Sequence, residues 1–65
     1  MTIAEANELR LGIYLIFWTS GGMSKAVIQK NYYGERLLTC HNWTGGTGVK
    51  LSSYINDIDN IVFIM

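Results

Sequence analysis

The 65-residue sequence predicts a mainly β domain, a small barrel or strongly bent sheet with one short N-terminal helix. Three observations lead to this prediction. Residues 13–18 form an unbroken run of aliphatic and aromatic side chains, which is typical of a strand covered on both faces. Glycine-containing turns separate several further short apolar segments. The chain is also too short for a second domain, so residues 1–65 are assigned to a single unit.

The N-terminal segment predicts a short amphipathic helix over residues 3–10. Thr2 and Glu5 have the spacing of a capping box, in which each side chain accepts a hydrogen bond from the backbone of the other. Apolar residues recur at three-residue intervals, and Gly12 stands where a helix C-cap is expected. A helix of two to three turns is marginal alone, so it must lie on an apolar surface.

The strand over residues 13–18 presents alternate side chains to opposite faces, and both faces are apolar. We expect the ring of Phe17 to lie in the core, so that its replacement by alanine costs roughly 3–5 kcal/mol. A chain of about 60 residues buries only ~60% of its unfolded surface. We therefore expect one face of this strand, or of a final strand over residues 60–65, to contact a second copy in a homo-oligomer.

Turn residues and apolar runs delimit the other elements. These are a turn (19–22), a strand (23–31), a turn (31–34), a strand (35–43), a loop (44–48), a strand (49–51), a helical turn (54–57) and a strand (60–65). The mixed polarity of residues 23–31 predicts a bulge. This order resembles that of SH3-like and Sm-like small barrels, which implies about five short antiparallel strands. Residues 49–55 carry no sequence signature of the RNA-binding Sm-like proteins.

The charge and cysteine content exclude several classes of function. Five basic residues balance five acidic ones, so no long-range field attracts nucleic acid or anionic lipid. The apolar run ending at Trp18 is too short to span a bilayer, and no signal peptide is visible, so we expect a cytoplasmic protein without a membrane partner. A single cysteine, Cys40, excludes an internal disulfide, and one histidine is too few for a structural zinc site.

No pair of residues predicts catalysis. Cys40 and His41 are neighbours on a strand, so their side chains point to opposite faces and cannot form a dyad. We expect a buried cysteine beside a half-exposed histidine. Asp57 and Asp59 lack the further oxygen ligands of a calcium loop and are read as turn residues. The prediction is therefore a protein with no catalytic residue, no metal and no cofactor.

A binding surface is predicted around the glycine-rich loop. The segment 44–50 lacks the spacing of a phosphate-binding P-loop, but its bare amides could form an anion-binding nest beside Lys50. Aromatic residues and a second cation flank this loop and could form a binding hot spot or a stacking surface. The predicted binding residues are Tyr32, Tyr33, Arg36, Trp43, Thr44, Gly45, Gly46, Thr47, Gly48 and Lys50.

These features favour binding rather than chemistry. Residues 6–12 resemble the opening of short proteins common in phage-derived bacterial DNA. This resemblance implies a phage or mobile-element accessory protein, and we expect such a protein to bind and block a host factor as a homo-oligomer. One alternative is an oligomeric sponge for a nucleotide-like small molecule. The other is a weak single-strand RNA binder of the Sm-like kind, although the zero net charge makes nucleic acid an unfavoured partner.

Overall fold

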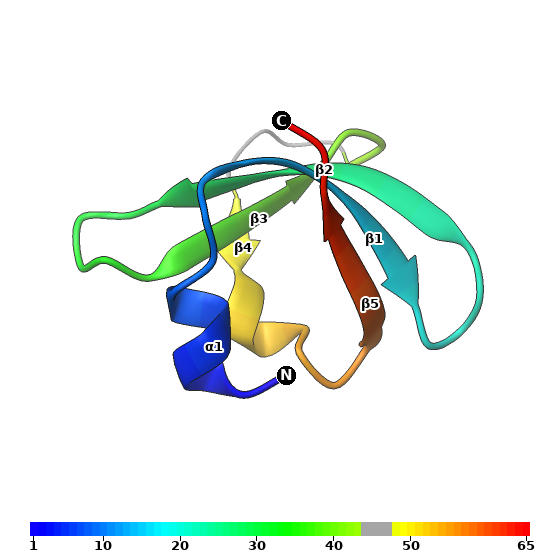
Figure 1. Cartoon of the computed structure of the whole chain (residues 1–65), viewed down its shortest axis with the longest axis horizontal. Coiled ribbons are helices and arrows are strands. Elements are labelled where there is room, and N and C mark those ends of the chain that lie inside the picture. Colours follow the sequence, from blue (N-terminus) through cyan, green and yellow to red (C-terminus); the bar gives the residue numbers. More distant parts are fainter. Residues whose placement is uncertain (44–47) are drawn as a thin grey trace.

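In a computed structural model that describes residues 1–43 and 48–65, five antiparallel strands form one sheet in the order β4-β3-β2-β1-β5 (Figure 1). The elements are α1 (Ile3–Asn7), β1 (Gly12–Trp18), β2 (Met23–Lys30), β3 (Arg36–Cys40), β4 (Val49–Lys50), the 3₁₀ turn η1 (Leu51–Ser53) and β5 (Ile58–Phe63). The predicted mainly β class with an N-terminal helix is confirmed. The sheet is bent but not closed, because β4 and β5 are its two edges, so the barrel is incomplete.

The helix α1 begins as predicted and ends early. The Thr2 hydroxyl accepts a hydrogen bond from the Glu5 amide at 3.1 Å, and the Glu5 carboxylate accepts one from the Thr2 amide at 3.2 Å. The helix ends at Asn7 and not at residue 10. The prediction that Gly12 caps this helix is wrong, because Gly12 is the first residue of β1. Its positive φ of 151° serves a different contact, considered in the Discussion.

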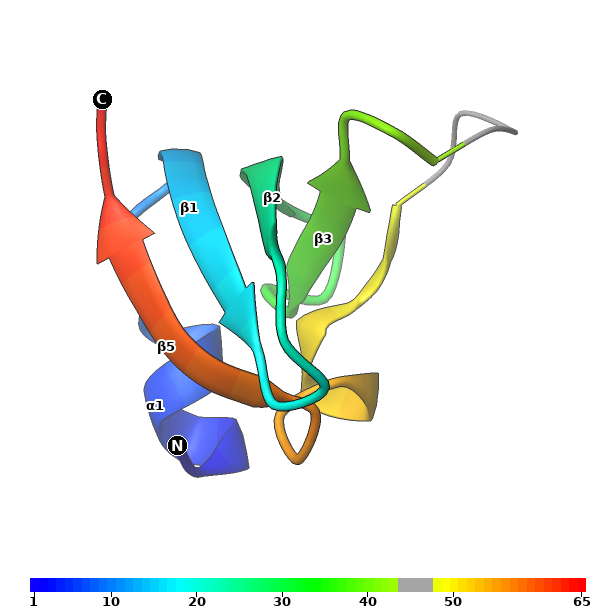
Figure 2. The same ribbon diagram turned by 90° about the vertical axis from the view of Figure 1, so that its right-hand side faces the viewer.

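The sheet has one covered face and one open face. The residues that are almost fully buried come from the covered face, from α1 and from η1, and they are Ala6, Tyr14, Ile16, Ala26, Ile28, Leu38, Cys40 and Leu51. Figure 2 shows α1 and the η1 turn behind the sheet, while no helix lies in front of it. We call the uncovered side the outer face. Its apolar residues are Ile13, Leu15, Phe17, Met23, Val27, Leu37 and Val62.

The prediction that Phe17 lies in the core is wrong. Tyr14 and Ile16 are buried, whereas Phe17 is only half-buried and belongs to the outer face. The buried aromatics can point inward because their polar atoms find partners there. The Tyr14 hydroxyl donates to the Arg10 carbonyl at 2.6 Å, and the Trp18 indole N–H donates to the Ser24 hydroxyl at 2.9 Å. These bonds remove the cost of burying polar groups.

Other element boundaries differ by a few residues. The predicted bulge in the second strand is wrong, because β2 pairs with β1 and β3 without a register shift. The irregularity lies between β1 and β5, at Phe17 and Trp18. The third strand ends at Cys40, where a turn begins. The helical turn occurs earlier, at Leu51–Ser53, and β5 starts two residues earlier than predicted.

Candidate functional site

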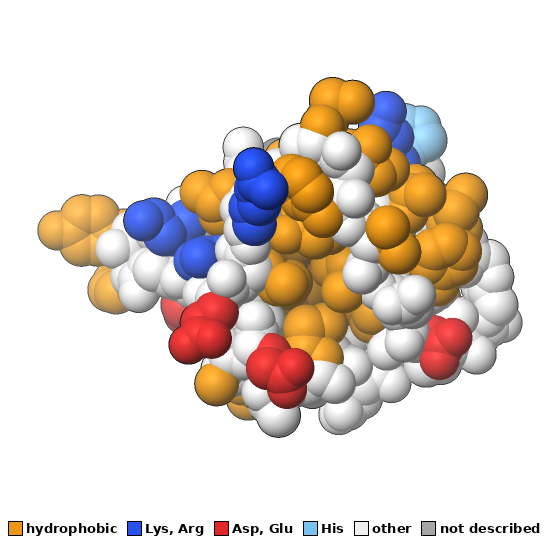
Figure 3. Space-filling model, viewed as in Figure 1, with side chains coloured by type: hydrophobic (Ala, Val, Ile, Leu, Met, Phe, Trp, Pro, Cys, Tyr) orange, Lys and Arg blue, Asp and Glu red, His pale blue; other side chains and the backbone are white. Residues whose placement is uncertain are grey.

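The turn between β2 and β3 projects from the body of the domain (Figure 1). It carries Tyr32 and Tyr33, whose side chains are 97% and 83% exposed. The two rings meet edge to face, with centroids 5.7 Å apart and an interplanar angle of 88°. Figure 3 shows hydrophobic side chains standing out from the body at this end, with Lys or Arg side chains behind them. We call residues 31–35 the tyrosine tip.

Asn31 holds the backbone of the tyrosine tip in one conformation. Its side-chain oxygen accepts hydrogen bonds from the amides of Tyr33 and Glu35, both at 2.9 Å. Its side-chain N–H₂ donates to the Glu35 carboxylate at 3.1 Å. The Gly34 amide donates to the Asn31 carbonyl, and the positive φ of Gly34, 83°, suits a glycine at this point of the turn. The tyrosines are therefore carried on a turn that is ordered before any partner arrives.

Lys50 lies at the base of the tyrosine tip, because β4 pairs with β3. Its ammonium is 3.3 Å from the Glu35 carboxylate. The hydrogen bond from Asn31, followed by Lys50, holds the pKa of Glu35 below its ordinary value. The Lys50 charge is thus already matched by an acidic neighbour, although a pair this exposed contributes little to stability.

Arg36 is close to the tip but is used within the chain. Its Nε donates to the Leu9 carbonyl at 2.7 Å, and a terminal guanidinium nitrogen donates to the Gly34 carbonyl at 2.9 Å. The Arg36 amide also donates to the Asn7 side chain at 3.2 Å. These bonds tie the segment that follows α1 to the start of β3. Arg36 therefore has a structural role, whatever else it contacts.

Trp43 lies at the opposite end of β3 from the tyrosine tip, so the structure does not bring these aromatics together. Trp43 is half-buried and packs on Tyr54, with ring centroids 5.6 Å apart. Gly48 lies against β3, and a Cβ at this position would come within 2.8 Å of the Thr39 hydroxyl. The predicted binding residues Thr44, Gly45, Gly46 and Thr47 lie outside the described residues.

Cys40 and His41 are arranged as the strand alternation predicted. Cys40 is buried in the core, and burial raises the pKa of its thiol above the ordinary value. His41 is exposed in the turn that follows β3. Within residues 1–43 and 48–65, no three His, Cys, Asp or Glu side chains are grouped closely enough to hold a metal ion.

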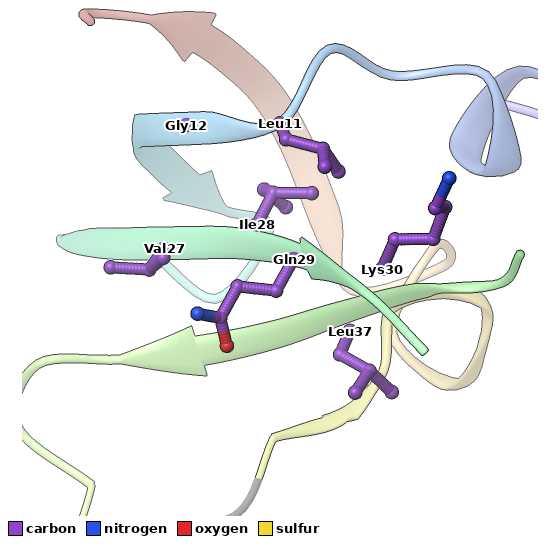
Figure 4. A pocket seen from close by; sticks show the side chains of 7 residues that line it. All are labelled: Leu11, Gly12, Val27, Ile28, Gln29, Lys30 and Leu37. Atoms are coloured by element: carbon purple, nitrogen blue, oxygen red, sulfur yellow. The ribbon is translucent and has the colours of Figure 1, made fainter. Parts of the chain in front are cut away.

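The outer face ends in an open hollow that sequence reasoning did not find. The hollow has a volume of about 670 Å³. Figure 4 shows that its walls come from β2, from β3 and from the chain entering β1. The lining residues are Leu11, Gly12, Val27, Ile28, Gln29, Lys30 and Leu37. No motif could have indicated it, because it depends on which strands are neighbours.

Comparisons of the chain with known protein families, with curated proteins and with solved structures find no match. Neither described helix combines the length and the apolar character needed to cross a bilayer. The function is therefore inferred from the geometry alone.

Proposed function

We propose that this chain is a non-enzymatic protein-binding module and that the tyrosine tip is the part that enters a pocket on the partner. One observation carries the proposal. Two adjacent tyrosines, 97% and 83% exposed, stand on a turn whose backbone is fixed by the Asn31 hydrogen bonds. Tyrosine is enriched among residues that dominate interface energies, because it buries a large rigid surface at a low cost in conformational entropy.

The fixed backbone of the turn supports this proposal further. Ordering a loop on binding opposes association, so a turn that is already ordered retains more of its contact energy. The partner class that we propose is a host protein, which the chain blocks as a phage or mobile-element accessory protein. This class rests on the resemblance of residues 6–12 alone.

The first prediction concerns the two tyrosines. In affinity capture from a host lysate with quantitative mass spectrometry, we expect the Tyr32→Ser/Tyr33→Ser variant to lose the partner that the parent retains. Neither side chain supports the core, so the variant should keep the parent melting temperature. The matched control is Thr19→Ala/Ser20→Ala, which changes two exposed residues of the β1–β2 turn. Equal capture by the parent and the tyrosine variant would contradict the proposal.

The second prediction concerns self-association through the outer face. We propose that two copies bury this face against each other, because it gathers exposed Met23, Val27 and Val62 around the half-buried side chains of β1. Val62→Lys places a charge opposite Leu15 on this face and should convert an oligomer into a monomer. The control Ile3→Lys adds the same charge on α1, behind the sheet.

Light scattering at micromolar concentration measures the outcome of the second prediction. The parent and Ile3→Lys should show at least twice the monomer mass, and Val62→Lys the monomer mass. A parent protein that is a stable monomer with a cooperative thermal transition would contradict self-association.

The two alternative functions make different use of the same residues. A nucleotide-like ligand would need cations, and the predicted cations Arg36 and Lys50 already contact groups within the chain. Single-stranded RNA could stack on Tyr32 and Tyr33, and this binding would weaken steeply with salt. Oligonucleotide binding measured at two salt concentrations therefore separates the RNA alternative from the protein-binding proposal.

A further inference from the structure

The strand β5 has an edge that no strand of residues 1–43 and 48–65 covers, because it is the last strand in the sheet order. Its register with β1 shows which backbone groups face this edge. The Ile64 amide donates to the Ile13 carbonyl, so in the alternating antiparallel ladder the groups of Asp59, Ile61 and Phe63 point away from β1. The Ile61 amide donates instead to the side chain of Asn60, at 2.9 Å.

This bond from Ile61 to Asn60 limits unselected pairing at an open edge. Native sheets protect their edges with local devices of this kind, because a free edge is a template for another strand. The bond is exposed and joins neighbouring residues, so a strand that offers its own carbonyl can replace it. The β5 edge is thus partly protected and still able to accept a strand.

A groove of about 300 Å³ runs between α1 and β5, beside this edge. Its apolar lining includes Leu9, Ile58 and Ile61, and its charged lining consists of Glu5 and Asp59. Among the described residues, no lysine or arginine lines it. Figure 3 looks onto this side of the molecule and shows hydrophobic side chains between α1 and β5, with Asp or Glu side chains at the lower edge. We call this feature the edge groove.

We propose that the edge groove binds an extended segment of another protein that carries lysine or arginine beside alternating apolar residues. The segment would add to β5 as a further strand. Main-chain hydrogen bonds to the β5 edge would supply affinity, and pockets for alternate side chains would supply specificity, as in other cases of strand addition. The two carboxylates, unmatched by a cation in the groove, select a basic partner. This surface is separate from the tyrosine tip.

The test uses three synthetic nine-residue peptides and amide NMR of the full chain. The first alternates valine and serine between terminal lysines, the second has glutamate in place of lysine, and the third repeats the first with N-methyl groups at every second residue. We expect the lysine peptide to shift the amides of Asp59, Ile61 and Phe63. The glutamate peptide should not bind, and N-methylation should weaken binding roughly tenfold or more, because it removes several ladder bonds.

Variants of the protein test the charge contribution. Glu5→Gln and Asp59→Asn should each weaken the lysine peptide about two- to fivefold, the range for exposed charge pairs. Glutamine still serves the helix cap, so Glu5→Gln leaves α1 intact. Glu8→Gln removes a carboxylate of the same helix end outside the groove and should change nothing. Tyr32→Ser/Tyr33→Ser should also bind the peptide normally, which separates this inference from the proposed function.

Three results would overturn the inference. They are the absence of binding at millimolar peptide, equal affinity for the methylated and unmethylated peptides, and shifts confined to amides away from β5. Shifts of the β5 amides with protein concentration alone would also overturn it, since a second copy of the chain would then be the occupant.

Discussion

Replacing Ile16 with alanine is expected to leave the domain largely unfolded at room temperature. Ile16 is fully buried between β2 and β5, in a core formed by few large side chains. Truncating a buried isoleucine costs about 2–5 kcal/mol. A core in a chain of this size rarely supplies more than about 3–5 kcal/mol of net stability. Circular dichroism during thermal unfolding measures the loss.

Phe17→Ala is the matched control for this prediction. Phe17 is the next residue of the same strand and has a larger side chain, but it lies half-buried on the outer face. We expect Phe17→Ala to keep a native spectrum and a cooperative transition. If Phe17→Ala unfolds the domain and Ile16→Ala does not, the assignment of the two faces of β1 is reversed.

Replacing Gly12 with alanine is expected to detach the C-terminal segment from β1. A Cβ at this position would lie 2.5 Å from the Met65 carbonyl oxygen and 2.8 Å from the Phe63 ring. The same Met65 oxygen accepts a hydrogen bond from the Ile13 amide at 2.7 Å. The φ of 151° adds strain of about 1–3 kcal/mol for a residue with a side chain. Each backbone hydrogen bond lost adds roughly 0.5–1.5 kcal/mol.

Gly21→Ala separates the clash from the backbone strain. Gly21 also has a positive φ, 95°, but a Cβ there would meet nothing within 4 Å. We expect Gly12→Ala to lower the midpoint of urea unfolding more than Gly21→Ala does, and to speed hydrogen exchange of the Ile13 and Ile64 amides. Equal midpoints for the two variants would show that Met65 does not pack closely on Gly12.

The local elements could be predicted because each has a local cause. The capping box at Thr2 and Glu5 acts over one helical turn, and the apolar run over residues 13–18 already defines a strand. The inward face of β1 could not be predicted, because alternation yields two sets of side chains and both sets are apolar. The structure selects the set whose polar atoms, those of Tyr14 and Trp18, find partners inside.

The candidate site was predictable in part. Tyr32 and Tyr33 follow from a turn signal that contains two aromatic residues, and the structure places them on that turn. The role of Arg36 was not predictable, because its partner Leu9 is 27 residues away in the chain. The separation of Trp43 from the tyrosines depends on the length of β3, which the sequence overestimated. The edge groove joins α1 to β5, near the two ends of the sequence, and no local pattern indicates it.

The most direct test of the tyrosine tip is the dissociation constant of the captured partner, measured by calorimetry with the parent, Tyr32→Ser, Tyr33→Ser and Thr19→Ala/Ser20→Ala. A hot-spot residue costs about 2 kcal/mol or more when truncated, which corresponds to a dissociation constant raised roughly 30-fold. We predict such a rise for at least one tyrosine variant, with no change for the control. Dissociation constants equal to the parent value in both tyrosine variants would contradict the account.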